Sequence, residues 1–278
     1  MFPVAMMVCT TAMLSGIGGA ALFMPIFLLI FPLLGPEYVL APVSAIAVAL
    51  FTEAFGFSSG FVGYRRRKLI DPGLGKSFLY WAVPLAVIGA LVAHWIPDVL
   101  IRFLYGLLMV IMALIFLKHH QQAEDSANAE DDSSLRTLTD SSGTTYKYRL
   151  YKSQNGQTGI GGFLTGMLSA GIGEVVMPQL VKKGKVPIPV AAGTSILVVI
   201  ITVFSASFAH IATLVQKGGL SAVPWNLLCY SIPGVLVGGQ IGTRLQGKIH
   251  PDTMERAIGI VFMLVGVAML AAVGLDFL

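Results

Sequence analysis

The chain has 278 residues, of which 55% are hydrophobic and only 12% charged, and its mean hydropathy is +0.80. A soluble domain carries about 25% charged residues. This composition excludes a soluble globular domain, because the chain lacks the polar surface to face water on all sides and lipid must cover much of it. The net charge of +4 is less informative than the positions of the charges.

The N-terminus is apolar from its first residue, with no Lys or Arg before the apolar run, so we read it as part of the mature protein and not as a cleavable signal peptide. Two cysteines, Cys9 and Cys229, lie inside apolar runs. They indicate neither a disulfide framework nor a thiolate metal site. We expect no metal and no cofactor.

Eight apolar stretches follow in chain order, and most are long enough to cross a bilayer, which takes about 20 residues. They cover residues 3–34, 38–63, 77–96, 99–117, 159–181, 190–216, 223–243 and 257–275. Residues 118–158 interrupt this pattern with an acidic, Ser-rich segment that is typical of a disordered linker. The sequence therefore predicts a first transmembrane module at 1–117, a hydrophilic linker at 118–158 and a second module at 159–278.

The two modules repeat the same landmarks in the same order. The motif LSGIG at 14–18 is matched by SAGIG at 169–173, and each is followed within a few residues by Met-Pro. The later matches are WAVP at 81–84 with YSIP at 230–233, and Pro-Asp at 97–98 and 251–252, followed by Arg102 and Arg256. Internal duplication of this kind is typical of secondary transporters.

The first apolar run of each module has a Gly-rich break and then a proline, which interrupts helical hydrogen bonding inside lipid. It could cross the membrane as a discontinuous helix, or enter and return as a re-entrant hairpin. Of the 18 Lys and Arg residues, 13 lie outside the linker. If all eight runs cross, these split 6 to 7 between the two faces. If the first runs are hairpins, 11 of these residues lie on one face of the membrane and only Arg102 and Lys217 lie on the other. The positive-inside rule favours this arrangement.

We therefore predict an all-α integral membrane protein built of two inverted-repeat modules. Each has a Gly-broken re-entrant or discontinuous helix and three transmembrane helices. The protein would lie in the plasma or inner membrane, with the linker cytoplasmic. The basic cluster at 65–68 sets topology in this interpretation, and a nucleic-acid partner is not expected. His94 and His210 lie near helix ends, as interfacial residues do.

The glycine breaks are the candidate substrate site. Where two short half-helices meet, unpaired N–H groups and the helix dipole can bind an anion. The alternative is that the glycines only permit close helix packing, and that nearby hydroxyls bond to their own backbone. The candidate substrate-binding residues are Ser15, Gly16, Gly18, Gly19, Ser169, Gly171, Gly173, Ser44, Thr194 and Ser195.

Two carboxylates lie within apolar runs. Glu53 is deep in the 38–63 run, and Glu174 directly follows the second glycine motif, where the first module has Gly19. Intramembrane carboxylates are costly and mark proton or cation carriers. For Glu53 the alternative is a neutral hydrogen-bonded acid, and for Glu174 a position in a wet vestibule.

Other classes fit less well. The tetrapeptide GIGE is similar to the GxGD of intramembrane aspartyl proteases, but no second Asp appears in an apolar run, and HExxH and GxSxG are absent. We expect a secondary transporter of small anions, for which these carboxylates suggest coupling to protons, and not an enzyme. The alternatives are an organic-acid or cation permease on the same scaffold and, with less support, an anion channel.

The two opening segments, LSGIGGAALFMP and LSAGIGEVVMP, separated by a hydrophilic linker, resemble the TauE/SafE family of sulfite and sulfonate exporters. The resemblance covers nearly the whole chain outside 118–158. It implies movement of small anions such as sulfite, sulfoacetate or other sulfonates, along a path that the segments Gly16–Gly19 and Gly171–Gly173 line. The second module departs from the usual glycines at Glu174 and is two residues shorter between glycine and proline.

Overall fold

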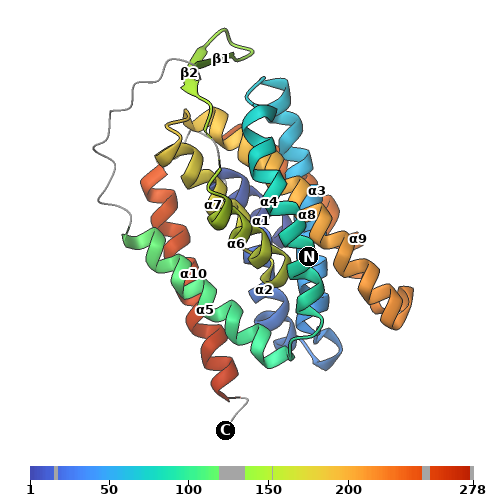
Figure 1. The fold of residues 1–278 in the computed structure, drawn as a ribbon. Coiled ribbons are helices and arrows are strands. Elements are labelled where there is room, and N and C mark those ends of the chain that lie inside the picture. Colours follow the sequence, from blue (N-terminus) through green and yellow to red (C-terminus); the bar gives the residue numbers. More distant parts are fainter. Residues whose placement is uncertain (16–17, 119–134, 152, 246–250, 276–278) are drawn as a thin grey trace.

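The structure is a computed structural model that describes residues 1–15, 18–118, 135–151, 153–245 and 251–275. It is mostly helical (Figure 1). Five of the described helices are long and apolar enough to cross a membrane. They are α3 (Pro42–Arg66), α4 (Pro72–Ala93), α5 (Asp98–Lys118), α8 (Ile188–Gly218) and α10 (Pro251–Leu275). A sixth, α9 (Trp225–Leu245), has 21 residues, enough for about 30 Å of helix, but is more polar. A mostly helical, multi-pass membrane protein is therefore confirmed.

The first segment of each module is broken where the sequence predicts it. In the first, α1 (Phe2–Ser15) is followed by α2 (Ala20–Pro25), a π-helical turn (Ile26–Ile30) and two 3₁₀ turns (Phe31–Leu33 and Pro36–Tyr38). In the second, α6 (Asn155–Leu168) is followed by α7 (Ile172–Pro178) and a π-helical turn (Gln179–Lys183). Both π-helical turns begin directly after a proline, which has no N–H for the regular ladder.

The second broken segment folds back on itself. Lys183 Nζ lies 2.6 Å from Gln154 Oε1, and the Gln154 N–H donates to Gln179 Oε1 at 3.1 Å. The start of α6 and the end of the π-helical turn after α7 therefore lie side by side. This is the geometry of a hairpin whose two ends are on the same side of the molecule.

Each broken segment packs mainly on the other module. Helix α1 lies along α9, and α6 lies along α4. Three glycines spaced four apart on α9, Gly234, Gly238 and Gly242, face α1 so closely that a Cβ would overlap it. On α6, Gly162 and Gly166 face the α4 backbone in the same way. Small residues at this spacing let helix backbones approach in a membrane, where dispersion contacts drive association.

The contacts also give the helix directions. Gly56 and Gly60 of α3 meet Val235 and Thr243 of α9 in the same order, so α3 and α9 are parallel, as are α1 and α9. Helices α4, α6 and α8 are mutually parallel by the same test. Between the two groups the order reverses, because Tyr64 of α3 meets Gly193 of α8 while Phe55 meets Phe204.

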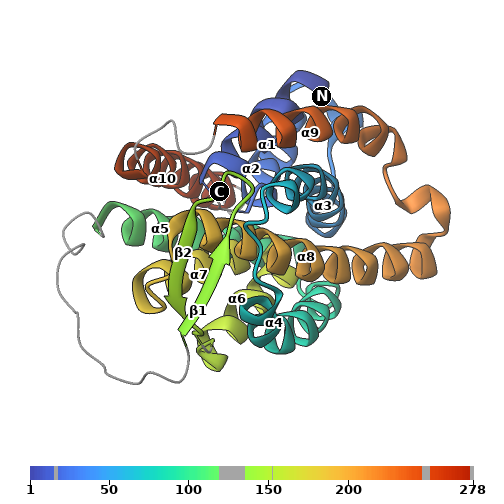
Figure 2. The same cartoon turned by 90° about the horizontal axis from the view of Figure 1, so that it is seen from above.

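Helices α5 and α10 form a pair of their own, antiparallel and packed chiefly on each other. Figure 2 shows this pair lying to one side of the remaining helices. Each is about one-third buried along its apolar span. The outer faces of both helices therefore present apolar side chains, as lipid-facing helices do.

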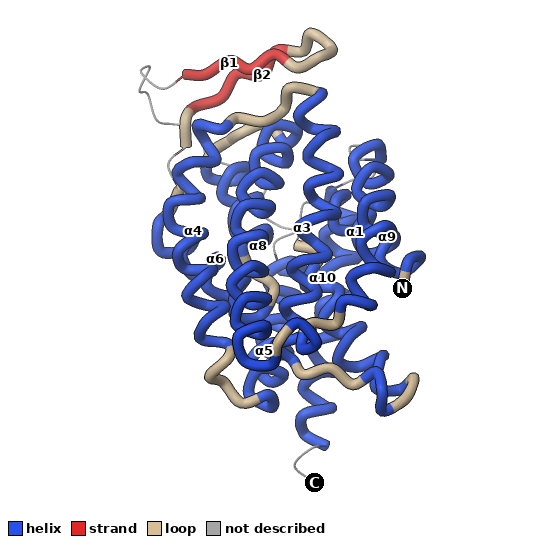
Figure 3. The backbone as a smooth tube through the Cα atoms, turned by 90° about the vertical axis from the view of Figure 1, so that its right-hand side faces the viewer, coloured by secondary structure: helices blue, strands red, loops and turns tan. Residues whose placement is uncertain are grey.

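Part of the segment expected to be a disordered linker is ordered. Strands β1 (Leu135–Thr139) and β2 (Thr145–Arg149) form an antiparallel hairpin at one end of the helical bundle (Figure 3). Tyr148 donates to Asp71 Oδ2 at 2.9 Å and Arg136 lies 3.2 Å from Oδ1. Asp71 is buried at the N-terminus of α4, and a buried carboxylate needs such partners. The rest of that expectation, at 119–134 and 152, lies outside the described residues.

Candidate functional site

The first carboxylate of the candidate site is Glu53, at the middle of α3. Its side chain is 2% exposed, and its Oε1 accepts a hydrogen bond of 2.5 Å from the Gly19 N–H. Gly19 is the residue before α2, so the carboxylate of a long helix binds the N-terminal end of the short one. That end carries the positive pole of a helix dipole and favours an anion.

The second carboxylate is Glu174, in the first turn of α7. Its Oε2 accepts a hydrogen bond of 2.9 Å from the Gly171 N–H, three residues earlier, and the residue is 7% exposed. Gly171 has a φ of +141°, which strongly favours glycine. The break after α6 therefore turns the chain so that Glu174 closes the N-terminus of its own helix.

The two carboxylates meet at Gly18. A Cβ built on Gly18 would lie 3.3 Å from Glu53 Oε1 and 3.5 Å from Glu174 Oε1. The two oxygens cannot be farther apart than the sum of those distances, and the two charges are close enough to interact. One acid from each module is thus brought together at the break in the first segment, which no spacing in the sequence reveals.

Three of the N–H groups that the structure describes at the breaks are not left free for a ligand. Gly19 and Gly171 donate to the two glutamates, and the Ile172 N–H donates to the Thr165 hydroxyl at 2.7 Å. The sequence hypothesis expects unpaired donors there. At Gly19 and Gly171 the acceptors are protein carboxylates, and binding of a substrate anion at the breaks stays a prediction.

Tyr105 of α5 is a residue of this region that the sequence reasoning missed. It is fully buried, and its hydroxyl donates to the Ala21 carbonyl of α2. A tyrosine inside an apolar run was the available signal, because a buried phenol must find a partner for its hydroxyl.

The other predicted residues fall into four groups. Gly16 and the Ser15 side chain lie outside the described residues. Gly173 and Ser169 are buried beside the second break, and the Ser169 hydroxyl has no hydrogen-bond partner. Thr194 lies apart from the carboxylates, since its hydroxyl accepts the Asp71 N–H at 3.1 Å.

Two more predicted hydroxyls are not tied to the carboxylates by any contact that the structure shows. Ser44 lies half-buried in the first turn of α3. Ser195, next to Thr194 on α8, is buried and its hydroxyl lacks a partner. A part in substrate binding stays a prediction for both.

A histidine pair lies at the far end of α4 and α8. His210 is fully buried, unlike an interfacial residue, and its Nδ1 is 3.2 Å from His94 Nε2. Its Nε2 is 2.7 Å from the Gly166 carbonyl, which can only accept, so Nε2 carries the proton and His94 donates to Nδ1. Burial and then the charge of Lys217 lower the pKa of His94, so this donor stays neutral at pH 7.

Paired broken segments, crossed packing of two modules and buried carboxylates where helices are interrupted define a class, the multi-pass membrane transporters. The family model described as sulfite exporter TauE/SafE matches residues 1–269, and the chain belongs to that family. This confirms the resemblance seen in the glycine motifs.

A curated relative is the "probable membrane transporter protein YunE" of Bacillus subtilis (strain 168). It is 24% identical over 263 residues, which cover 92% of this chain and 91% of the relative. No solved structure matches.

Proposed function

We propose that this protein is a secondary transporter of small anions, with sulfite and sulfonates as the first candidates, and that it moves the anion together with a proton. One observation carries the proposal. Carboxylates from both modules converge on Gly18, and each holds an N–H group at a helix break. The family description supports the choice of anion.

The mechanism follows from competition for those N–H groups. An ionised glutamate at a break occupies the position that a substrate anion needs. Two ionised carboxylates this close, and this deeply buried, repel each other and any third anion. A proton on one glutamate weakens its bond to the N–H and removes the repulsion, so the donor becomes available to the substrate. Binding of the anion and uptake of the proton are thereby linked.

We further infer that the modules are inverted with respect to each other, with both broken segments re-entrant. The reversal of direction between α3 and α8 supports this, as does the 11-to-2 division of Lys and Arg. In this orientation the β1–β2 hairpin is cytoplasmic, and the protein lies in the cell membrane.

Labelling of single cysteines in a background without Cys9 and Cys229 tests the orientation. A cysteine at Lys183 should be shielded from an impermeant thiol reagent added outside intact cells, and a cysteine at Lys217 should react. Strong outside labelling at position 183 would rule out the inverted arrangement.

Flux into liposomes tests the function. Purified protein should carry radiolabelled sulfite or a sulfonate, and an imposed pH gradient should drive accumulation against the substrate gradient. Sulfite, sulfoacetate, acetate and sodium are to be compared in one panel. Movement of acetate alone would favour an organic-acid permease, and movement of cations alone would overturn the anion assignment.

A further inference from the structure

A cavity lies about 16 Å along α3 from Glu53, since 11 residues of helix separate Glu53 from Tyr64. It has a volume of about 400 Å³, between the end of α3, the start of α8 and the turn of the β1–β2 hairpin. The apolar side chains of Leu69, Ile188 and Pro189 line part of it. The cavity therefore joins both modules and the hairpin.

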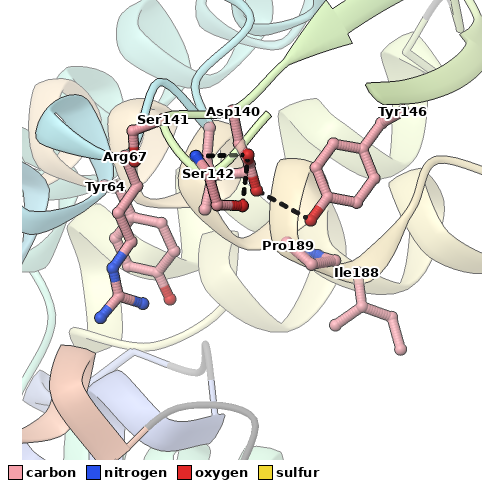
Figure 4. Close-up of a pocket in the computed structure, with 9 residues that line it drawn as sticks. Tyr64, Arg67, Asp140, Ser141, Ser142, Tyr146, Ile188 and Pro189 are labelled. Atoms are coloured by element: carbon pink, nitrogen blue, oxygen red, sulfur yellow. Dashed lines mark hydrogen bonds between the residues drawn. The ribbon is translucent and has the colours of Figure 1, made fainter. Parts of the chain in front are cut away.

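Two groups from the end of α3 face this cavity. Tyr64 is 2% exposed, and its buried hydroxyl has no hydrogen-bond partner. Figure 4 shows that hydroxyl ending beside the guanidinium of Arg67, which is close enough for its charge to act on the tyrosine. A guanidinium and a hydroxyl side by side can share a ligand that has several acceptor oxygens.

The hairpin turn closes the cavity without filling this position. The Ser142 hydroxyl, followed by the N–H groups of Thr144 and Ser142, lowers the pKa of Asp140, so that carboxyl is ionised. Its oxygens accept hydrogen bonds from Ser142 and Thr144 of the turn and from Tyr146 of β2, and Figure 4 shows the bonds to Ser142 and Tyr146. The Ser141 N–H bonds the Arg67 carbonyl at 3.1 Å, so the turn is attached to the same residue that supplies the cation.

We infer that this cavity is a binding site for an oxyanion head group, held by the Arg67 guanidinium and the Tyr64 hydroxyl under the hairpin turn. The site is separate from the carboxylate pair and does not depend on the proposed function. Its volume leaves room for more than a bare oxyanion. The ligand is a free sulfur or phosphorus oxyanion, or the phosphate of a lipid, and the two share the same chemistry.

Equilibrium binding of ³⁵S-sulfate to the purified full-length protein in detergent tests the inference. Arg67→Gln should weaken sulfate binding at least tenfold, and Tyr64→Phe, which keeps the ring, should weaken it severalfold. Arg66→Gln is the matched control, because it removes the same charge one residue earlier and outside the cavity. It should leave binding within about twofold of wild type.

An equal loss in Arg66→Gln and Arg67→Gln would show a diffuse effect of charge and overturn the site, as would binding unchanged in Arg67→Gln. Mass spectrometry of co-purified lipid identifies the source. If wild type retains an anionic lipid that sulfate displaces and that Arg67→Gln loses, the ligand is a lipid phosphate. If no such lipid is retained while sulfate binding is intact, the ligand is a free oxyanion. Glu53→Gln should keep the Arg67-dependent binding, so failure of transport and failure of this site are distinguishable.

Discussion

The two helix breaks use the same glycine motif but obtain their carboxylate from different places. At the first break the acid comes from a long helix, where Glu53 of α3 reaches the Gly19 N–H. At the second it comes from the break itself, where Glu174 bonds the Gly171 N–H. The two breaks thus carry complementary side chains, so that two acids meet at one place, beside Gly18.

Thr202 sharpens this comparison. It lies 31 residues before Pro233, as Glu53 lies 31 residues before Pro84, the matching proline of the first module. Thr202 is fully buried and its hydroxyl has no partner. The second module therefore has a small hydroxyl where the first has an acid, and an acid where the first has Gly19. Two acids in each module would place four buried charges together, which is far more costly.

The largest expected effect is the loss of proton coupling. Glu53→Gln and Glu174→Gln each remove one titrating group while keeping the side-chain size. We expect each variant to exchange substrate down its gradient but to lose at least tenfold of the uptake that a pH gradient drives, as measured in liposomes. If only one acid carries the proton, the other variant keeps a wild-type pH profile, and the two breaks then have different roles.

Gly171 and Gly18, one at each break, should respond differently to substitution by alanine. In Gly171→Ala the new Cβ lies 2.7 Å from the Gly161 carbonyl, at a φ of +141°. A strained φ costs about 1–3 kcal/mol, so the thermal midpoint should fall by several degrees. In Gly18→Ala the three atoms nearest the methyl group all belong to the two glutamate side chains, at 3.3 Å and beyond. That variant should keep its midpoint but lose anion flux. Thermal unfolding and flux on the same preparations measure both, and equal stability of the two variants would contradict the comparison.

Much of the fold follows from local patterns. The apolar runs, the glycine breaks and the prolines predict the broken segments, because each is a short-range effect on backbone hydrogen bonding. The crossed packing of α1 on α9 and α6 on α4 depends on surface fit between distant helices, which periodicity does not encode. The formation of the β1–β2 hairpin in a segment predicted to be disordered likewise depends on a distant partner. Arg136 of β1 bonds to Asp71, a buried carboxylate 65 residues earlier in the chain.

The site was predictable only in its parts. Glu53, Glu174 and the glycines are conspicuous because acids are rare in apolar runs. Their meeting at Gly18, and the occupation of the N–H groups by those acids, arise from three-dimensional packing. Thr194 shows the converse, since a hydroxyl at the start of a helix bonds the Asp71 N–H and lies away from the acids.

The smallest expected effect separates two hydroxyls at the second break. Thr165 bonds both ways, donating to the Gly161 carbonyl at 2.8 Å and accepting the Ile172 N–H at 2.7 Å. Thr165→Ala leaves that N–H unpaired and should destabilise the protein by about 1–3 kcal/mol.

Ser169 is buried with an unpartnered hydroxyl, so Ser169→Ala removes no hydrogen bond of the substrate-free protein and should leave the thermal midpoint unchanged. If the Ser169 hydroxyl donates a hydrogen bond to the substrate anion, Ser169→Ala should weaken anion binding by roughly tenfold, the equivalent of about 1.4 kcal/mol. Isothermal titration with sulfite, beside thermal unfolding, measures both quantities. Unchanged affinity in Ser169→Ala would place the substrate nearer the first break, at Gly18, and make the two breaks unequal in binding as well as in the origin of their carboxylates.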